Sequence, residues 1–244
     1  NEDRERPHVN LVIAVPSVRP ERRKAIRETW LKWADDRVVL RFFTEPPNEA
    51  DPNHSEMTTL LAEESLAHGD ITVIDIGRGM NFGVKLLEAM KWMSHHYSFD
   101  FFLRLDDDYF LCLERLLSEL SCLLESGAQA SPFYAGNLMC EQVPYVDEAY
   151  SLVTSVVIDY IVSAADLKCT GYGSLTMAAW LRPGGPGNPQ GDVAWVSDSR
   201  LDFWGGWGGW WERWEQNSSI PACELMMGIH RTYPDEMKKH WGEI

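Results

Sequence analysis

Three adjacent carboxylic acids, Asp106, Asp107 and Asp108, are the residues of this sequence whose types and spacing are best suited to chemistry. They follow residues 99–103, a run apolar enough for a strand buried on both faces. Neighbouring carboxylates repel one another, and a cation among them removes that repulsion. Mg²⁺ and Mn²⁺ prefer such oxygen ligands and are often shared with substrate phosphates. A solvated acidic turn is the alternative, but the flanking apolar segments favour a metal–phosphate site.

Two arginines, Arg23 and Arg27, lie four residues apart on a helix expected over residues 21–33. Pro20 suits the first turn of that helix, because its missing N–H has no partner there. A strand, a tight loop and then a helix start with arginines form a sensible place for phosphates. A solvated basic face explains the same spacing, and the spacing alone favours that interpretation.

His230 follows the apolar segment 225–229, and a single histidine in such a place is more often structural than a ligand. Residues 204–214 hold five tryptophans interleaved with glycines. Tryptophan faces suit stacking against sugar rings, and tryptophan also fills protein cores. The pattern leaves both interpretations of this segment open.

The elements that must position these residues alternate along the first half of the chain. Strands are expected over 10–17, 37–43, 71–76 and 99–103, and helices over 21–33, 57–68, 81–97 and 111–124. This alternation predicts an α/β fold with a mostly parallel central sheet and helices on both faces. Ligands of open α/β sheets bind at the carboxyl ends of strands, where the three aspartates lie. Further along, strands are expected over 133–136 and 150–163, a short helix over 164–168, and another helix from Pro234.

The composition fits one large globular domain, with 244 residues, of which 45% are hydrophobic and 24% charged. The net charge of −15 argues against a nucleic-acid partner. No run of about 20 apolar residues is present, and no signal peptide is visible. The polar first residues are expected to be the cut end of a longer chain.

Five cysteines without a Cys-x-x-Cys pair argue against a structural zinc site, and their odd number allows up to two disulfides. Asn53 and Asn217 each begin an Asn-x-Ser tripeptide, the acceptor pattern for N-glycosylation. Together these features favour a secretory compartment.

Several stretches together resemble the β-1,3-galactosyltransferase and N-acetylglucosaminyltransferase family, glycosyltransferase family 31. The family motifs R-R-x-x-I-R-x-T-W, N-L-T-x-K-T, D-D-D-x-F, G-Y-V-x-S-x-D and H-x-x-x-P-x-E-M are similar to residues 22–30, 81–86, 106–110, 159–166 and 230–237. These matches occur in the family's order. Residues 175–183 and 198–202 look most like the branch that adds the second galactose of the proteoglycan linker.

The resemblance implies a single GT-A catalytic domain over 1–244, with a nucleotide- and metal-binding half at 1–125 and an acceptor-binding half at 126–244. It implies a type II membrane protein of the Golgi lumen, whose anchor and stem are absent from this sequence. The expected reaction moves galactose from UDP-galactose to a galactose-terminated glycan acceptor in β-1,3 linkage, with inversion at the sugar carbon and with Mn²⁺ as cofactor.

The same resemblance implies roles for individual residues. Asp108 and His230 would hold the metal, and Asp106 and Asp107 would hold ribose or metal-bound waters. The candidates for the nucleotide are Arg23, Arg27 and Lys85.

One departure from the family concerns the general base. The family carries an acidic pair just before the segment that resembles residues 175–183, whereas this chain has Gly173 and Ser174 there. We predict Asp192 as the base, because it follows a Gly/Pro-rich loop and lies 38 residues before His230 (230 − 192). Asp159 is the second choice, as an acid on an expected apolar strand.

The missing pair leaves other functions open. A catalytically inactive relative could act as a chaperone or partner of an active transferase. A β-1,3-N-acetylglucosaminyltransferase and a glycan-binding module that uses the tryptophans are further alternatives.

Overall fold

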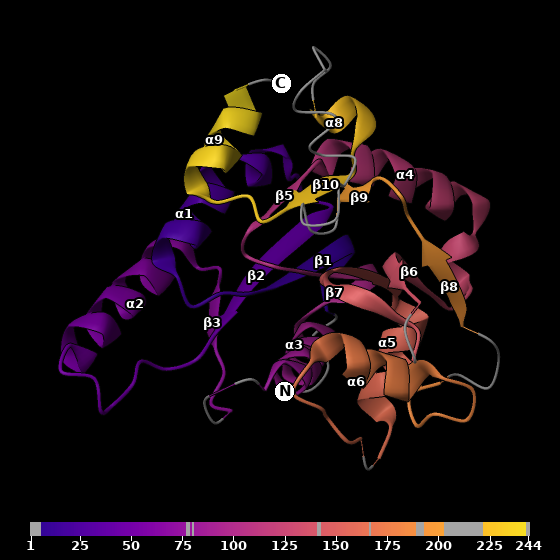
Figure 1. Cartoon of the computed structure of the whole chain (residues 1–244), viewed down its shortest axis with the longest axis horizontal. Coiled ribbons are helices and arrows are strands. Elements are labelled where there is room, and N and C mark those ends of the chain that lie inside the picture. Colours follow the sequence, from indigo (N-terminus) through magenta and orange to yellow (C-terminus); the bar gives the residue numbers. More distant parts are fainter. Residues whose placement is uncertain are drawn as a thin grey trace.

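The computed structural model describes residues 6–76, 79, 81–140, 143–165, 167–188, 193–202 and 222–242. Its centre is a seven-stranded sheet in the order β3-β2-β1-β4-β7-β6-β8 (Figure 1). The strands are β1 His8–Pro16, β2 Val38–Thr44, β3 Ile71–Val73, β4 Ser98–Leu105, β6 Phe133–Met139, β7 Tyr145–Thr154 and β8 Ala194–Ser197. Within this sheet only β7 runs against the other strands. Strands from both the predicted nucleotide half and the predicted acceptor half therefore share one sheet.

Helices cover both faces of the sheet (Figure 1). One face carries α1 Pro20–Glu28, the 3₁₀ turn Trp30–Trp33, α4 Leu113–Ser126 and α9 Pro234–Gly242. The other carries α3 Phe82–His96, α5 Ser155–Ser163 and α6 Gly173–Leu181. The predicted α/β class, with a mostly parallel sheet between two helical layers, is confirmed. None of the described helices is long and apolar enough to cross a membrane.

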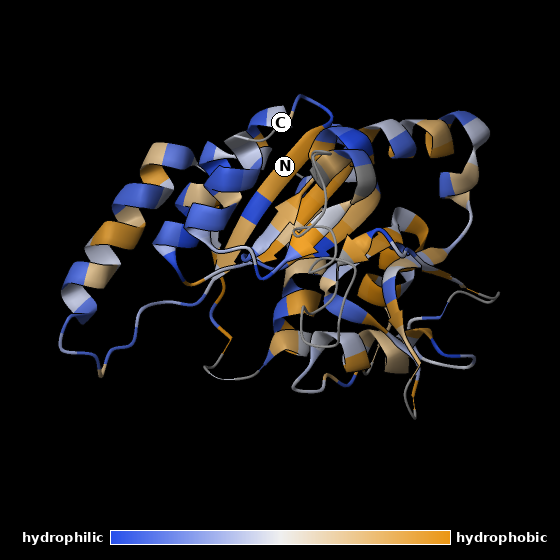
Figure 2. Ribbon diagram, turned by 45° about the horizontal axis from the view of Figure 1, so that its top comes forward, coloured by the Kyte–Doolittle hydropathy of each residue, from blue (hydrophilic) through white to orange (hydrophobic). Residues whose placement is uncertain are grey.

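The central strands β1 and β4 form the core of the molecule, and they stand out as hydrophobic in Figure 2. Leu11, Ile13, Phe101 and Leu103 are all fully buried. A parallel strand covered by helices on both faces has no solvent side, so its sequence is a continuous apolar run rather than an alternating one. That run carries the chain to the carboxyl edge of the sheet, where the three aspartates follow β4.

Two predicted elements of the second half are wrong. Residues 155–163 form helix α5 rather than the end of a strand, and residues 164–168 are not helical where they are described. The β-branched residues of this stretch suggested a strand. The buried side chains are Val157, Ile158 and Ile161, whose spacing of one, three and four residues is that of one helix face.

A second, three-stranded sheet joins distant parts of the chain. It has the order β5-β10-β9, from β5 Tyr109–Leu111, β10 Gly228–His230 and β9 Leu201–Asp202. β5 and β10 are antiparallel, and their register places His230 opposite Tyr109. Tyr109, which directly follows the three aspartates, therefore pairs with His230.

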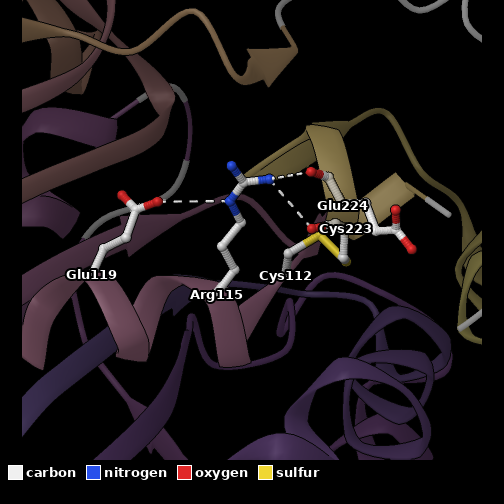
Figure 3. Close-up of a disulfide and its surroundings, with 5 residues drawn as sticks. All are labelled: Cys112, Arg115, Glu119, Cys223 and Glu224. Carbon is white, nitrogen blue, oxygen red and sulfur yellow. Dashed lines mark hydrogen bonds and ion pairs between the residues drawn. A yellow bond between two sulfur atoms is a disulfide. The ribbon is translucent and has the colours of Figure 1, made fainter. Parts of the chain in front are cut away.

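A disulfide between Cys112 and Cys223 supports this pairing (Figure 3). Cys112 directly follows β5, and Cys223 lies in helix α8 Ala222–Leu225, just before β10. Arg115 of α4 donates to the backbone carbonyl oxygens of Cys223 and Glu224, at 3.3 and 2.9 Å. The cross-link therefore ties the segment before His230 to the segment after the aspartates. Among the described cysteines, Cys122, Cys140 and Cys169 are free.

Replacing both Cys112 and Cys223 with alanine should lower the free energy of unfolding by about 2 to 4 kcal/mol. The reason is that the bond spans 111 residues and restricts the unfolded chain. Urea unfolding of the oxidised protein and of the double variant measures the difference. The exposed free thiol of Cys140 gives a matched control, and Cys140→Ala should leave stability nearly unchanged. Equal stability of the double variant and the wild type would contradict the prediction.

Candidate functional site

The three aspartates lie at the carboxyl end of β4, and each carboxylate faces different partners. The Asp106 backbone N–H donates to the carbonyl oxygen of Ala149 on β7, at 3.0 Å, which fixes the chain as it leaves the sheet. Asp106 and Asp108 face His230, whereas Asp107 faces the β1–α1 loop. Three adjacent acids are therefore separated into two groups by the directions of their side chains.

Asp106, Asp108 and His230 form the first group, with one ligand atom from each lying within 4.8 Å of the others. His230 Nε2 lies 3.5 Å from Asp106 Oδ2 and 3.4 Å from Asp108 Oδ1. The next residue, Arg231, has a φ of 57°, in the left-handed region. The chain turns there, and the Thr232 N–H donates to the Asp108 carbonyl oxygen at 2.8 Å. The pairing of β5 with β10 and this turn together hold the histidine beside the two carboxylates.

This donor set suits a divalent cation. Carboxylate oxygens are the ligands that Mg²⁺ and Mn²⁺ prefer, and imidazole serves other divalent metals as well. Burial would lower the pKa of His230, but the Asp106 and Asp108 carboxylates raise it to about 9. Burial would raise the pKa of Asp106, and the charges of Arg104 and His230 more than offset this, holding it below its usual value. A cation would thus meet two carboxylates and displace one proton from the imidazole.

Without metal, the free energy of unfolding should fall by up to about 3 kcal/mol as the pH rises from 6.5 to about 9. The folded-state pKa of His230 is raised, so the folded protein holds a proton that the unfolded chain has already released in this range. The stabilisation is complete below pH 6.5 and is lost as the pH rises through 9. Urea unfolding in a chelator at pH 6, 7.5 and 9 measures it. An identical pH slope for His230→Gln would exclude this residue as the cause.

Asp107 forms the second group with Ser17 and Arg22, which lie at the β1–α1 connection. Its carboxylate accepts from Ser17 Oγ at 2.8 Å and from Arg22 Nη1 at 2.5 Å. Arg22 Nη1 also lies 3.3 Å from Asp108 Oδ2, and its guanidinium sits over the ring of Tyr233. Burial raises the pKa of Asp107, which the Arg22 and Ser17 hydrogen bonds oppose. Arg22 therefore joins the aspartates to the helix expected to carry phosphate ligands.

Arg23 and Arg27 point elsewhere. The Arg23 guanidinium donates to Glu64 of α2 (His54–His68) and to the Ser17 carbonyl oxygen, and its side chain is only 3% exposed. Arg27 donates to Glu64 and to Asp70, and its guanidinium lies over the ring of Phe42. These contacts join α1 to α2 and to the edge of the sheet. Arg22 is one residue from Arg23, so it lies on a different face of α1, and periodicity alone did not single it out.

A cavity of about 360 Å³ lies beside the aspartates, on the α3 side of the sheet edge. Its lining includes Arg22, Arg104, Asp106, Asp107, Lys85 and Phe82. The Lys85 ammonium pairs with Glu45 and lies 5.1 Å from the centre of the Phe82 ring. Lys85 is thus the predicted nucleotide residue that the structure places in this cavity. Arg23 and Arg27 face a separate cavity between α1 and α2.

Of the two candidates for the general base, the structure describes Asp159 but not Asp192. Asp192 lies outside the described residues. Asp159 is on helix α5 rather than on a strand, and its side chain is exposed. Partial burial raises its pKa, and the charge of Arg6, just before β1, lowers it. Asp159 therefore lies near the amino-terminal end of β1, at the edge of the sheet opposite the aspartates, and the structure removes it as a candidate base.

Two carboxylates near the site, Asp147 and Glu148 on β7, were not anticipated. Burial raises the pKa of Asp147, the charge of Asp106 acts in the same direction, and His230 opposes it. Glu148 Oε2 accepts from the backbone N–H groups of Gly173 and Ser174, at 2.6 and 3.2 Å. The sequence shows both acids, but only the pairing of β7 with β4 brings them to the sheet edge.

The fold and the site define an α/β protein whose acidic strand end is suited to a metal and a phosphorylated ligand. The family described as "Galactosyltransferase" matches residues 21–179, and the chain belongs to this family.

Among curated relatives, human N-acetyllactosaminide beta-1,3-N-acetylglucosaminyltransferase 2 is 29% identical over 145 residues, which are 57% of this chain and 36% of the relative. UDP-GalNAc:beta-1,3-N-acetylgalactosaminyltransferase 2 of Mus musculus is 24% identical over 189 residues, 68% of this chain and 37% of the relative. Beta-1,3-galactosyltransferase 6 of Mus musculus is 31% identical over 106 residues, 41% of this chain and 31% of the relative. The matches thus span about a third of the length of these relatives.

Solved glycosyltransferases match this chain at low similarity. One involved in the glycosylation of the major capsid of PBCV-1 is 11% identical, with a TM-score of 0.45 over 96% of this chain and 100% of that one. The mannosyltransferase PcManGT from Pyrobaculum calidifontis, in complex with GDP-Man and Mn²⁺, is 12% identical, with a TM-score of 0.44 over 91% of this chain and 68% of that one. The family assignment rests on the match over residues 21–179.

Proposed function

We propose that this chain is the catalytic part of an inverting, metal-dependent β-1,3-glycosyltransferase that moves galactose from UDP-galactose to a galactose-terminated glycan. The observation that carries the proposal is the grouping of Asp106, Asp108 and His230 at the carboxyl edge of the sheet. A cavity lined by Arg22 and Lys85 lies directly beside this group. Carboxylates for a cation next to cationic side chains for phosphates are what a nucleotide-sugar donor requires.

In this proposal Asp108 and His230 would hold Mn²⁺, and Asp106 would hold the ribose or a metal-bound water. The cation would supply positive charge beside the diphosphate of the departing UDP. Arg22, already 3.3 Å from Asp108, and Lys85 are placed to bind phosphate oxygens. The nucleotide role predicted for Arg23 and Arg27 is not part of this proposal, because both side chains line a separate cavity between α1 and α2 and pair there with Glu64 and Asp70.

The acceptor hydroxyl needs a base on the far side of the sugar carbon from the metal, because inversion requires in-line attack. Asp192 remains the proposed base. It would take the hydroxyl proton as the acceptor oxygen attacks. Asp107, which also accepts from Ser17, holds Arg22 in place through one ion pair.

A second candidate function is a non-catalytic relative that assists an active transferase. The observation in its favour is that Gly173 and Ser174 occupy the positions where the family carries its acidic pair. A third candidate keeps the chemistry and changes the donor, since the relatives are named for N-acetylglucosamine, N-acetylgalactosamine and galactose.

The Golgi lumen, a membrane anchor beyond this sequence, and an acceptor on the proteoglycan linker belong to the same proposal. The disulfide supports the compartment, because such bonds persist in oxidising environments. The linker acceptor is supported by the resemblance of residues 175–183 and 198–202 to that branch.

A donor screen tests the proposal. Thermal unfolding is measured with Mn²⁺ and, in turn, UDP-galactose, UDP-N-acetylglucosamine and UDP-N-acetylgalactosamine, and transfer is measured on β-galactosides and N-acetyllactosamine. We expect stabilisation by Mn²⁺ with UDP-galactose and transfer to a β-galactoside. Stabilisation without transfer to any acceptor would support the non-catalytic relative. No stabilisation by any UDP-sugar would reject the site itself.

A further inference from the structure

Arg104, on the strand that carries the aspartates, has no assigned role in the function proposed above. Its side chain is 5% exposed and lines the cavity beside Asp106. The Nη2 nitrogen lies 2.8 Å from Asp106 Oδ1. The Nη1 nitrogen is buried and has no hydrogen-bond partner within the described part of the chain. The Nη2 group of the guanidinium therefore has a hydrogen-bond acceptor among the described residues, and the Nη1 group has none.

A buried charged N–H without an acceptor is destabilising. A folded protein that keeps such a group therefore often uses it to bind a ligand. The arginine side chain cannot reduce this free-energy cost by deprotonation, because a guanidinium stays charged in proteins. Burial would lower the pKa of Arg104, but the charges of Asp106, Glu148 and Asp147 raise it. The unpaired N–H thus remains a strong donor on a side chain that lines the cavity.

Glu148, whose charge acts on Arg104, lies on the neighbouring strand β7 and is held by the start of α6. Its Oε2 accepts from the backbone N–H groups of Gly173 and Ser174. A Cβ at Gly173 would lie 2.8 Å from the same oxygen, so the glycine leaves the space that the carboxylate fills. A rigid acceptor and a rigid donor therefore come from the neighbouring strands β7 and β4.

The charges around Arg104 indicate what it binds. Asp106, Asp147 and Glu148 all act on its guanidinium, so the local potential is unfavourable for an additional anion such as a phosphate. A neutral hydroxyl accepts from an N–H and donates to a carboxylate without adding charge. Arg22 and Lys85 offer the phosphates a better place in the same cavity.

We propose that Arg104 and Glu148 form the subsite for hydroxyl groups of the donor's hexose, with Arg104 Nη1 donating to one hydroxyl oxygen and the Glu148 carboxylate accepting from a hydroxyl. This inference rests on the proposed function, since it assumes a nucleotide-sugar donor in the cavity. It assigns recognition of the sugar to side chains of β4 and β7, apart from the residues that bind the diphosphate.

Titration calorimetry in saturating Mn²⁺ tests the subsite by comparing UDP with UDP-galactose on the wild type, Arg104→Lys and Glu148→Gln. We expect each variant to bind UDP within twofold of the wild type and UDP-galactose about tenfold more weakly. The exposed Arg37, which pairs with Asp35, provides the control variant Arg37→Lys, and both affinities should stay unchanged. Thermal unfolding without ligand verifies that each variant is folded.

Equal weakening of UDP and UDP-galactose would overturn the inference, because Arg104 would then act on the phosphates or on the metal ligand Asp106. Unchanged binding of both ligands would overturn it as well. A wild type that binds neither ligand in Mn²⁺ would instead reject the proposed function. The two failures are therefore distinguishable.

Discussion

Replacing Asp108 with asparagine should abolish the stabilisation of the fold by Mn²⁺ and UDP and reduce transfer by about a thousandfold or more. The variant keeps the size of the side chain but removes one of the two carboxylates that face His230. In saturating Mn²⁺, the wild type should gain about 2.7 kcal/mol when UDP is present at 100 times its dissociation constant. Thermal unfolding with and without Mn²⁺–UDP measures the gain, and a transfer assay measures the rate.

His230→Ala should give the same loss, because it removes the third member of the group. The matched control is Asp36→Asn, an exposed carboxylate far along the chain from the site, which should keep both the gain and the rate. A normal Mn²⁺–UDP gain in Asp108→Asn would show that the metal lies elsewhere.

Asp192→Asn should leave Mn²⁺–UDP binding intact and lower the transfer rate by a factor on the order of 10² to 10⁴. An amide cannot take the proton of the acceptor hydroxyl, whereas the metal and phosphate ligands are untouched. Separate measurements of binding by calorimetry and of turnover by product formation distinguish a base from a binding residue.

Asp159→Asn provides the comparison for this base, since the structure places that carboxylate on the exposed side of α5. It should leave the transfer rate unchanged. Near-normal turnover in Asp192→Asn would remove Asp192 from the mechanism. A wild type that binds UDP-galactose but transfers to no acceptor would favour the assisting, non-catalytic role.

The first half of the fold was predictable because its strands are short, mostly apolar segments between recognisable turns. The apolar run that contains Phe101 and Leu103 indicates a strand with helices on both faces, and the acids that follow it mark its carboxyl end. The stretch 155–163 was predicted as a strand because it is rich in β-branched residues, which occur in strands and also in buried helices. The structure has a helix there, and the spacing of Val157, Ile158 and Ile161 is that of one buried helix face.

Other parts of the site depended on side-chain directions that spacing does not contain. Neighbouring arginines on a helix face different partners, so Arg22 reaches Asp107 whereas Arg23 binds Glu64. The unpaired N–H of Arg104 is evident only from the structure, in which β7 pairs with β4 and the guanidinium is buried. In the sequence, an arginine two residues before an acidic cluster suggests a surface ion pair. His230 was placed beside Asp108 by family resemblance, not by local pattern.

The pairing of β5 with β10 has a consequence for biosynthesis. Tyr109 leaves the ribosome long before its partner His230, since 121 residues separate them (230 − 109). At about 5 to 20 residues per second, this gap lasts roughly 6 to 24 seconds. During that time the nascent chain presents Asp106 and Asp108 without His230, and β5 without its partner β10. The emerging chain thus has a defined interval in which a folding factor or a bound cation would have the greatest effect on its yield.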